Sequence, residues 1–410
     1  MTEACKIAID RDDLLDENGT MESSTRLLAH CCRPDNADGD AKQLAALVAG
    51  ITVWQRLMDL ALRHRVMPLL YERLRTMPAG AIPGDFMEEL RRRYIANASR
   101  NEVMTRELVK VLDIMSAQGI RAMPIKGPVL AVLAYGDISH RMFDDLDILL
   151  KVEDIEKAAK ELLSLGYEPF IELSEVERKA HVQAGWGWSM HSPGRDYYVE
   201  LDTGITPEHF SFRVDPGLLW ENTELVTLEE RSFHTMFVEN LLLLLCVHGT
   251  KHLWERLAWI ADVGQLVRRR SDINWHRVLG RARSLGGLRM VLLGLGLCRD
   301  VLEIELPDEI VEAMRQDAAV ERLIRRVVEQ IKPSAREKVM HLSELPFHLA
   351  ARERMRDKMR HFLTLVFRPS YADWKSVRLP ESLFFLYYLI RPVRLMLNFL
   401  FSSRQGESDM

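Results

Sequence analysis

The stretch Phe-Asp-Asp-Leu-Asp-Ile-Leu-Leu at 143–150 constrains the fold of this chain more than any other. Its alternating pattern predicts a β-strand over 143–152. Side chains at positions i and i+2 of a strand point to the same face, so Asp145 and Asp147 would project side by side while Leu146 and Ile148 enter a core. Two carboxylates this close repel each other unless a cation lies between them. Oxygen ligands suit Mg²⁺ or Mn²⁺, although Asp-x-Asp pairs also occur in solvated turns.

A glycine turn precedes this strand. Ile125-Lys126-Gly127-Pro128 predicts a short strand, over 121–125, that ends in a tight turn and opens a short helix. Free N–H groups at the start of a helix attract phosphate, and Gly127 lets the backbone approach closely. Lys126 could add a charge on a triphosphate, or be an ordinary exposed lysine. Arg141, between the two motifs, could pair with phosphate or brace an aspartate.

The pattern is helical on both sides of this region. A long helix is predicted over 85–118, with Gly119 as its cap, and the sequence beyond about 235 is helical to its end. Two further strands, at 186–191 and 197–202, flank a Pro-Gly turn and predict a hairpin. We therefore expect an α+β fold with a small mixed β-sheet between an N-terminal helical segment and a C-terminal helical bundle. The expected divisions are a polar lead-in at 1–40, the helical segment at 41–102, the α/β core at 103–232 and the C-terminal helical domain at 233–410.

Composition excludes some classes of protein. The net charge of −5 and the pI near 6.3 argue against general nucleic-acid binding. The five cysteines contain no CxxC pair, which favours a reducing cytoplasm over a disulfide framework. The first residues do not have the pattern of a signal peptide.

The longest apolar stretch, 383–401, is interrupted by Arg391, Pro392 and Arg394, so we expect no transmembrane span. It is either a helix that packs on the body or a weak contact with a membrane surface.

The motifs together resemble the core of the polymerase-beta-type nucleotidyltransferase superfamily, and more narrowly the bacterial uncharacterised nucleotidyltransferase family. The resemblance covers about residues 45–270. It rests on Ile-Lys-Gly at 125–127, Leu-Ala-Tyr-Gly at 133–136, Arg-Met-Phe-Asp-Asp-Leu-Asp-Ile-Leu-Leu at 141–150, and Leu-Leu-Ser-Leu-Gly-Tyr at 162–167. Helical segments at 61–69 and 242–262 also look like parts of that family.

The resemblance implies an Mg²⁺-dependent (or Mn²⁺-dependent) enzyme in which an acceptor oxygen attacks the α-phosphorus of a nucleoside triphosphate. Asp145 and Asp147 would hold the metal. The superfamily's later strand tends to read Asp-Leu-His, whereas this chain has Glu200-Leu201-Asp202, so either Glu200 or Asp202 could supply the third carboxylate, with Glu200 favoured. The usual Gly-Ser is Gly127-Pro128 here, and Lys126 would replace the missing hydroxyl.

Other residues have more than one interpretation. His248, Lys251 and His252 could form a wall of the nucleotide cleft or simply line a helix interface, while a zinc site is disfavoured because no glutamate stands between the histidines. Trp186 and Trp188 could stack a base but are more typical of a core. The arginine-rich stretch 352–360 is most simply a solvated face, with an anionic partner as the alternative.

Two functions follow from these interpretations. The first is transfer of a nucleoside monophosphate, AMP from ATP, onto a small molecule, a protein or RNA. The alternative is a catalytically inactive member of the same fold that binds nucleotide or a partner, as a peripheral component of a polysaccharide or peptide biosynthetic system. The altered Gly-Ser and Asp-Leu-His positions favour the alternative somewhat.

Overall fold

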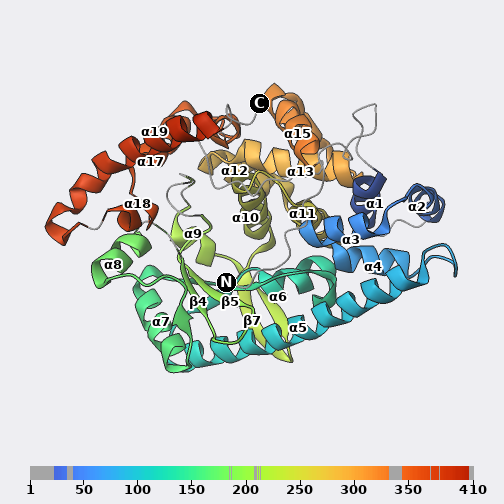
Figure 1. The fold of residues 1–410 in the computed structure, drawn as a ribbon, viewed down its shortest axis with the longest axis horizontal. Coiled ribbons are helices and arrows are strands. Elements are labelled where there is room, and N and C mark those ends of the chain that lie inside the picture. The colour runs from blue at the N-terminus through green and yellow to red at the C-terminus, as the bar shows by residue number, and fades with distance from the viewer. Residues whose placement is uncertain are drawn as a thin grey trace.

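The computed structural model describes residues 23–34, 40–183, 185, 187–206, 210, 212, 214–331, 344–369, 371–377 and 379–405. The fold is α+β, as expected: a small mixed sheet lies between N-terminal helices and a large C-terminal set of helices (Figure 1). Trp186 and the first 22 residues lie outside the described residues, so the interpretation of Trp186 and most of the lead-in at 1–40 has no structural counterpart here.

The central sheet has five strands in the order β1-β2-β5-β4-β3. Strand β2 pairs in parallel with β5, and the other neighbours are antiparallel. The parallel pair sets Asp147 opposite Glu200, and the hairpin between β4 and β5 agrees with the predicted one. The strands are β1 (Ala122–Pro124), β2 (Asp145–Leu150), β3 (Glu168–Pro169), β4 (Trp188–His191) and β5 (Tyr198–Asp202).

A second, two-stranded sheet was not predicted from the sequence. Strands β6 (Thr223–Leu228) and β7 (Arg231–Met236) form an antiparallel hairpin beside β1. The hydroxyl of Thr235 donates to the carbonyl of Pro124 at 2.7 Å and so joins the hairpin to the central sheet. The turn is formed by Glu229 and Glu230, both with positive φ, a backbone usually supplied by glycine or asparagine.

One long helix and several shorter helices and turns surround the central sheet. The 34-residue helix α5 (Gly84–Ala117) runs along the lower edge in Figure 1. The turn after β1 opens α6 (Gly127–Leu130), which continues into a π-helical turn η1 (Ala131–Tyr135) and, after Gly136, a 3-10 turn η2 (Ile138–His140). After β2 come the 3-10 turn η3 (Val152–Asp154) and α7 (Ile155–Ser164), and α8 (Glu175–Gln183) precedes β4.

The N-terminal helices and the C-terminal helices share one hydrophobic core, whereas α5, α7 and the sheet enclose a second. Helix α1 lies inside the stretch expected to be a polar lead-in, and Leu27 and Leu28 are fully buried there. The N-terminal helices are α1 (Ser23–Cys31), α2 (Asp40–Ala49), α3 (Trp54–Arg63) and α4 (Met67–Leu74).

The chain is helical after the β6–β7 hairpin, as expected, and α10 to α13 lie above the sheet in Figure 1. The helices of this part, with the short α9 before the hairpin, are α9 (Pro216–Trp220), α10 (Val238–Lys251), α11 (Leu257–Arg269), α12 (Trp275–Leu285), α13 (Leu288–Leu302), α14 (Asp308–Arg315), α15 (Ala318–Gln330), α16 (Leu345–Ala350), α17 (Met355–Phe367), α18 (Tyr371–Ser376), the 3-10 turn η6 (Glu381–Leu386) and α19 (Tyr387–Gln405).

One expectation about the C-terminal region changes. The stretch 352–360 is not uniformly solvated, because Arg352 is 1% exposed and donates to the carbonyls of His348 and Phe210. No single helix among the described residues is long and apolar enough to cross a membrane, and α2 with α3 meets that criterion only as a pair bent by 118°.

Candidate active site

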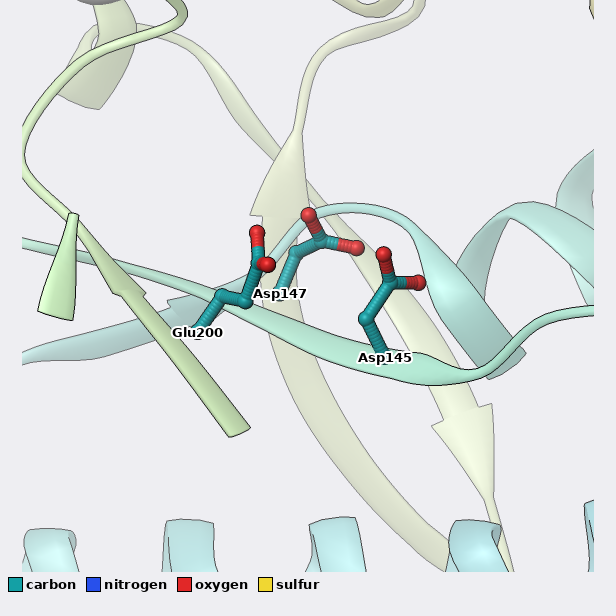
Figure 2. A group of neighbouring side chains, drawn as sticks. All are labelled: Asp145, Asp147 and Glu200. Atoms are coloured by element: carbon teal, nitrogen blue, oxygen red, sulfur yellow. The ribbon is translucent and has the colours of Figure 1, made fainter. Parts of the chain in front are cut away.

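Three carboxylates gather on one face of the central sheet. Asp145 and Asp147 alternate along β2, and Glu200 lies opposite Asp147 on the parallel strand β5. One oxygen from each of the three lies within 4.8 Å of the other two. Figure 2 shows the carboxylates extending to the same side of the strands. Oxygen donors at this spacing can share one divalent cation, because carboxylates are the ligands that Mg²⁺ and Mn²⁺ prefer.

Asp147 occupies the deepest position of the three. Its side chain is almost fully buried. Oδ1 forms an ion pair with the ammonium of Lys126, whereas Oδ2 is buried without a hydrogen-bond partner among the residues that the structure describes. A buried carboxylate normally has its lone pairs satisfied, so the unpartnered Oδ2 fits a metal ligand.

Burial raises the pKa values of Asp147 and Glu200. Burial, partly opposed by Lys126, raises the pKa of Asp147 to about 7. Burial, together with the charges of Asp147 and Asp202, raises the pKa of Glu200 to about 8. Both groups therefore bind protons more tightly than ordinary carboxyls, as expected for carboxyl groups buried beside other carboxylates.

Asp202 and Lys251 lie beside the cluster without belonging to it. Asp202 is not among the three carboxylates that share a common centre, and its Oδ1 lies against the backbone of Gly187, where a Cβ would approach it to 2.2 Å. Burial raises the pKa of Asp202, whereas Lys126 and Lys251 lower it. Burial also lowers the pKa of Lys251, and Lys126 lowers it further. The end of α10 therefore places a second ammonium near the carboxylates.

Gly127 lets the turn after β1 pass close to β2. Its φ of +52° is in the left-handed region, and an added Cβ would lie 3.0 Å from the carbonyl oxygen of Asp145. Only glycine meets both conditions without strain. Lys126, the residue before it, is thereby directed at Asp147. The turn and the short helix α6 match the expectation, although α6 is only four residues long.

Arg141 is engaged by an aspartate from a distant helix. Its Nε and Nη2 donate to Asp262 of α11 at 2.9 and 3.0 Å, and the hydroxyl of Tyr135 donates to the same carboxylate at 2.8 Å. Asn101 of α5 holds the carbonyl of Arg141 at 2.8 Å. Of the two roles open to Arg141, the structure shows the bracing of an aspartate. Its Nη1 is buried without a hydrogen bond to any described residue.

The two histidines of α10 form an aromatic group with Trp259. The ring centroids of His248 and His252 are 4.7 Å apart, and both rings contact Trp259, at 5.7 and 5.2 Å. Arg256 lies over the outer side of Trp259. Burial lowers the pKa of His252 to about 3 and that of His248 well below its usual value, with further lowering from Lys126 and Lys251. Both imidazoles are therefore neutral near pH 7.

A cluster around Asp144 was missed by the sequence analysis. Arg65, in the loop between α3 and α4, forms an ion pair with Asp144, and Arg100 of α5 approaches the same carboxylate to 3.3 Å. His64, next to Arg65, accepts a hydrogen bond from the backbone N–H of Leu257 at 3.3 Å. Single arginines carry no local signal, so only the tertiary structure could reveal that they hold the start of β2.

A pocket opens at the far edge of the sheet, beyond β4. It is lined by aromatic and apolar side chains, including Phe170, Val182 and Trp188, and encloses about 40 Å³. The Trp188 ring lies 5.6 Å from the guanidinium of Arg178. The pocket is too small for a nucleobase, which leaves Trp188 in the packing role expected for it.

Comparison with known proteins gives one match. The family model described as an uncharacterised nucleotidyltransferase matches residues 52–303, which include β1 to β7 and all the candidate site residues. No curated protein and no solved structure matches the chain.

Proposed function

The chain belongs to the uncharacterised nucleotidyltransferase family, and on this premise we propose that it transfers a nucleoside monophosphate, AMP from ATP, to an acceptor hydroxyl with Mg²⁺ or Mn²⁺. The observation that supports this most is the carboxylate group of Asp145, Asp147 and Glu200. The buried Oδ2 of Asp147, which has no hydrogen-bond partner among the described residues, supports a metal ligand there.

Charge supports a divalent ion at this place. Four carboxylates, Asp145, Asp147, Glu200 and Asp202, lie near two ammonium groups, Lys126 and Lys251. Arg141 adds no excess charge because Asp262 neutralises it. The remaining two negative charges match one divalent cation. When bound, the ion would neutralise the developing charge on the phosphate oxygens.

The residues around the ion have separate tasks in the proposed reaction. The acceptor oxygen forms a bond to the α-phosphorus while the bond from that phosphorus to the bridging oxygen breaks, and pyrophosphate leaves with the electron pair. Glu200 would hold the ion beside the two aspartates or take the proton of the acceptor hydroxyl, since its raised pKa suits a base near neutral pH. Lys126 and Lys251 would contact the triphosphate. Asp202 remains a secondary candidate ligand.

Arg141 and the two histidines would position the chain and the nucleoside rather than neutralise the charge of the triphosphate. Arg141 would fix the segment before β2 through Asp262, with its free Nη1 as the donor left for a phosphate oxygen. His248 and His252 are neutral, so we assign them to stacking against the nucleoside instead of pairing with phosphate. Trp259 extends the same aromatic group.

The metal site is tested by calorimetric titration with Mg²⁺ and ATP. Wild-type protein should bind both, and the double variant Asp145→Asn/Asp147→Asn should lose Mg²⁺ binding by at least about a hundredfold. Glu153→Gln, an exposed acid after β2, is the matched control. Equal binding by the wild type and the double variant would refute the site.

Catalysis is tested with nucleoside triphosphates carrying a labelled α-phosphate and a cell lysate as the source of acceptors. Label transfer from ATP that disappears in Asp147→Asn supports the enzyme. Intact Mg²⁺–ATP binding without any label transfer would support the inactive, nucleotide-binding alternative. The Lys126–Asp147 ion pair and the missing Gly-Ser hydroxyl favour that alternative.

A further inference from the structure

Helices α17 and α19 present their apolar sides outward. On α17, Met355, Met359 and Leu363 are spaced by four residues, as on one face of a helix, and Met355 is 71% exposed. The opposite side carries Asp357 and His361, which are buried. A surface helix of a water-soluble protein normally buries its apolar side and exposes its charged side.

The same inversion is present on α19. Leu389, Val393 and Met396 are all more than half exposed and lie on one face. Its inward side carries Arg391 and Arg394, which both pair with the fully buried Asp373 of α18 at 2.8 and 2.6 Å. Here too the ion pairs are inside and the apolar side chains are outside. Helices α17 and α19 contact each other at one edge of the molecule in Figure 1.

A basic cleft adjoins α17. It encloses about 380 Å³ between α13, α15 and α17, and four cationic side chains but no acidic one line it: Arg289, Arg322, Arg326 and Lys358. Arg289 is neutralised by Asp317. Arg322, Arg326 and Lys358 have no ion pair with any carboxylate of the described residues. The cleft therefore holds uncompensated positive charge.

The charge of the C-terminal region differs from that of the whole chain. Residues 352–405 contain eleven Lys and Arg against four Asp and Glu, in a chain whose net charge is −5. Arg356 and Arg360 lie beside the exposed methionines on α17, and Lys358 lies on the other flank. An apolar face flanked by basic residues is the pattern of helices that lie in the interface of an anionic membrane.

We propose that α17 and α19 dock the protein on an anionic lipid surface, with the exposed apolar side chains entering the interface and the basic cleft holding a lipid phosphate. The proposal is independent of the catalytic assignment. It explains why the apolar sides face outward and gives a role to the positive charge of the cleft beside them.

The test is flotation of the full chain with vesicles. Wild-type protein should float with vesicles of phosphatidylcholine and phosphatidylserine and remain behind with phosphatidylcholine alone. Arg322→Glu/Arg326→Glu should weaken this flotation by at least about tenfold, and Met359→Asp/Leu389→Asp should also reduce it. Arg91→Glu/Arg106→Glu, on exposed positions of α5, is the matched control and should float like the wild type. Circular dichroism checks the fold of each variant.

Three results would overturn the proposal. Equal flotation with both vesicle types would remove the role of the basic cleft. A control variant as weak as the cleft variant would show that only net charge matters. Absence of flotation, with a wild-type dimer by light scattering that Met359→Asp/Leu389→Asp converts to monomer, would assign the surface to a second copy of the chain.

Discussion

Arg141 and Asp262 form a two-pronged ion pair, with N–O distances of 2.9 and 3.0 Å, between the segment that precedes β2 and helix α11. Both side chains are nearly buried. The pair therefore couples the strand that carries Asp145 and Asp147 to the helical region that carries His248 and Lys251. The contact joins residues 121 positions apart in the chain.

Loss of this ion pair should destabilise the protein strongly. Asp262→Asn leaves the guanidinium of Arg141 buried without a counter-charge, which costs about 3–5 kcal/mol of unfolding free energy. The measurement is urea denaturation at neutral pH. Asp272→Asn makes the same chemical change in the exposed pair with Arg270 and should cost less than about 1 kcal/mol. An equal loss of unfolding free energy in the two variants would contradict a structural role of the buried pair.

Substitution of Gly127 should affect metal binding beyond its effect on stability. Gly127→Ala meets both a positive φ and the carbonyl of Asp145 at 3.0 Å, so the turn or the strand must shift. Gly119→Ala has a similar φ of +69° but no neighbour within 4 Å. Backbone strain should lower the free energy of unfolding of both variants by about 1–2 kcal/mol, which thermal unfolding measures. Only Gly127→Ala should also weaken Mg²⁺ binding in calorimetry, and an equal Mg²⁺ affinity in the two variants would argue against the close approach.

The affinity for Mg²⁺ should rise steeply between about pH 6 and pH 9. A metal ion binds the ionised carboxylates, and the pKa values of Asp147 and Glu200 are raised to about 7 and about 8, so protons compete with the metal in this range. Below it both groups hold protons, and above it neither does. Titration in buffers of different ionisation enthalpy should detect proton release on binding near pH 7. An affinity that is constant over this range would be inconsistent with these groups as ligands.

Acid should destabilise the protein through His64. Burial lowers the pKa of His64 from 6.5 to about 4, so the unfolded chain takes up a proton that the folded protein does not. Stability from this group is fully present above pH 6.5 and is lost as pH falls towards 4, by up to about 1.4 kcal/mol per pH unit. In His64→Asn the pH slope of the unfolding free energy should fall by about one proton. His234→Asn makes the same change at an exposed position of the β6–β7 hairpin and is the matched control.

Local patterns were sufficient where neighbouring residues decide the structure. The alternation at 143–150 predicted β2 and the shared face of its two aspartates, because strand geometry is set by adjacent residues. Pro193 and Gly194 predicted the β4–β5 hairpin in the same way. The β6–β7 hairpin was missed because Glu229 and Glu230 adopt positive φ without the usual glycine or asparagine.

Choices between equivalent residues needed the tertiary structure. Spacing allows either Glu200 or Asp202 to serve as the third carboxylate, and the parallel register that sets Glu200 opposite Asp147 separates them. The fold likewise brings Asp262 to Arg141, 121 positions away in the chain. Such pairings join residues far apart in the chain, so no local pattern encodes them.

The sequence by itself determined the α+β class, the strand with its two aspartates and the glycine turn before it, because these depend on local geometry and side-chain type. The tertiary structure alone decided the rest: which acid completes the group, that Arg141 is held by Asp262, and that α17 and α19 expose their apolar sides. An amphipathic pattern shows that a helix has two faces, but only packing shows which face the protein covers.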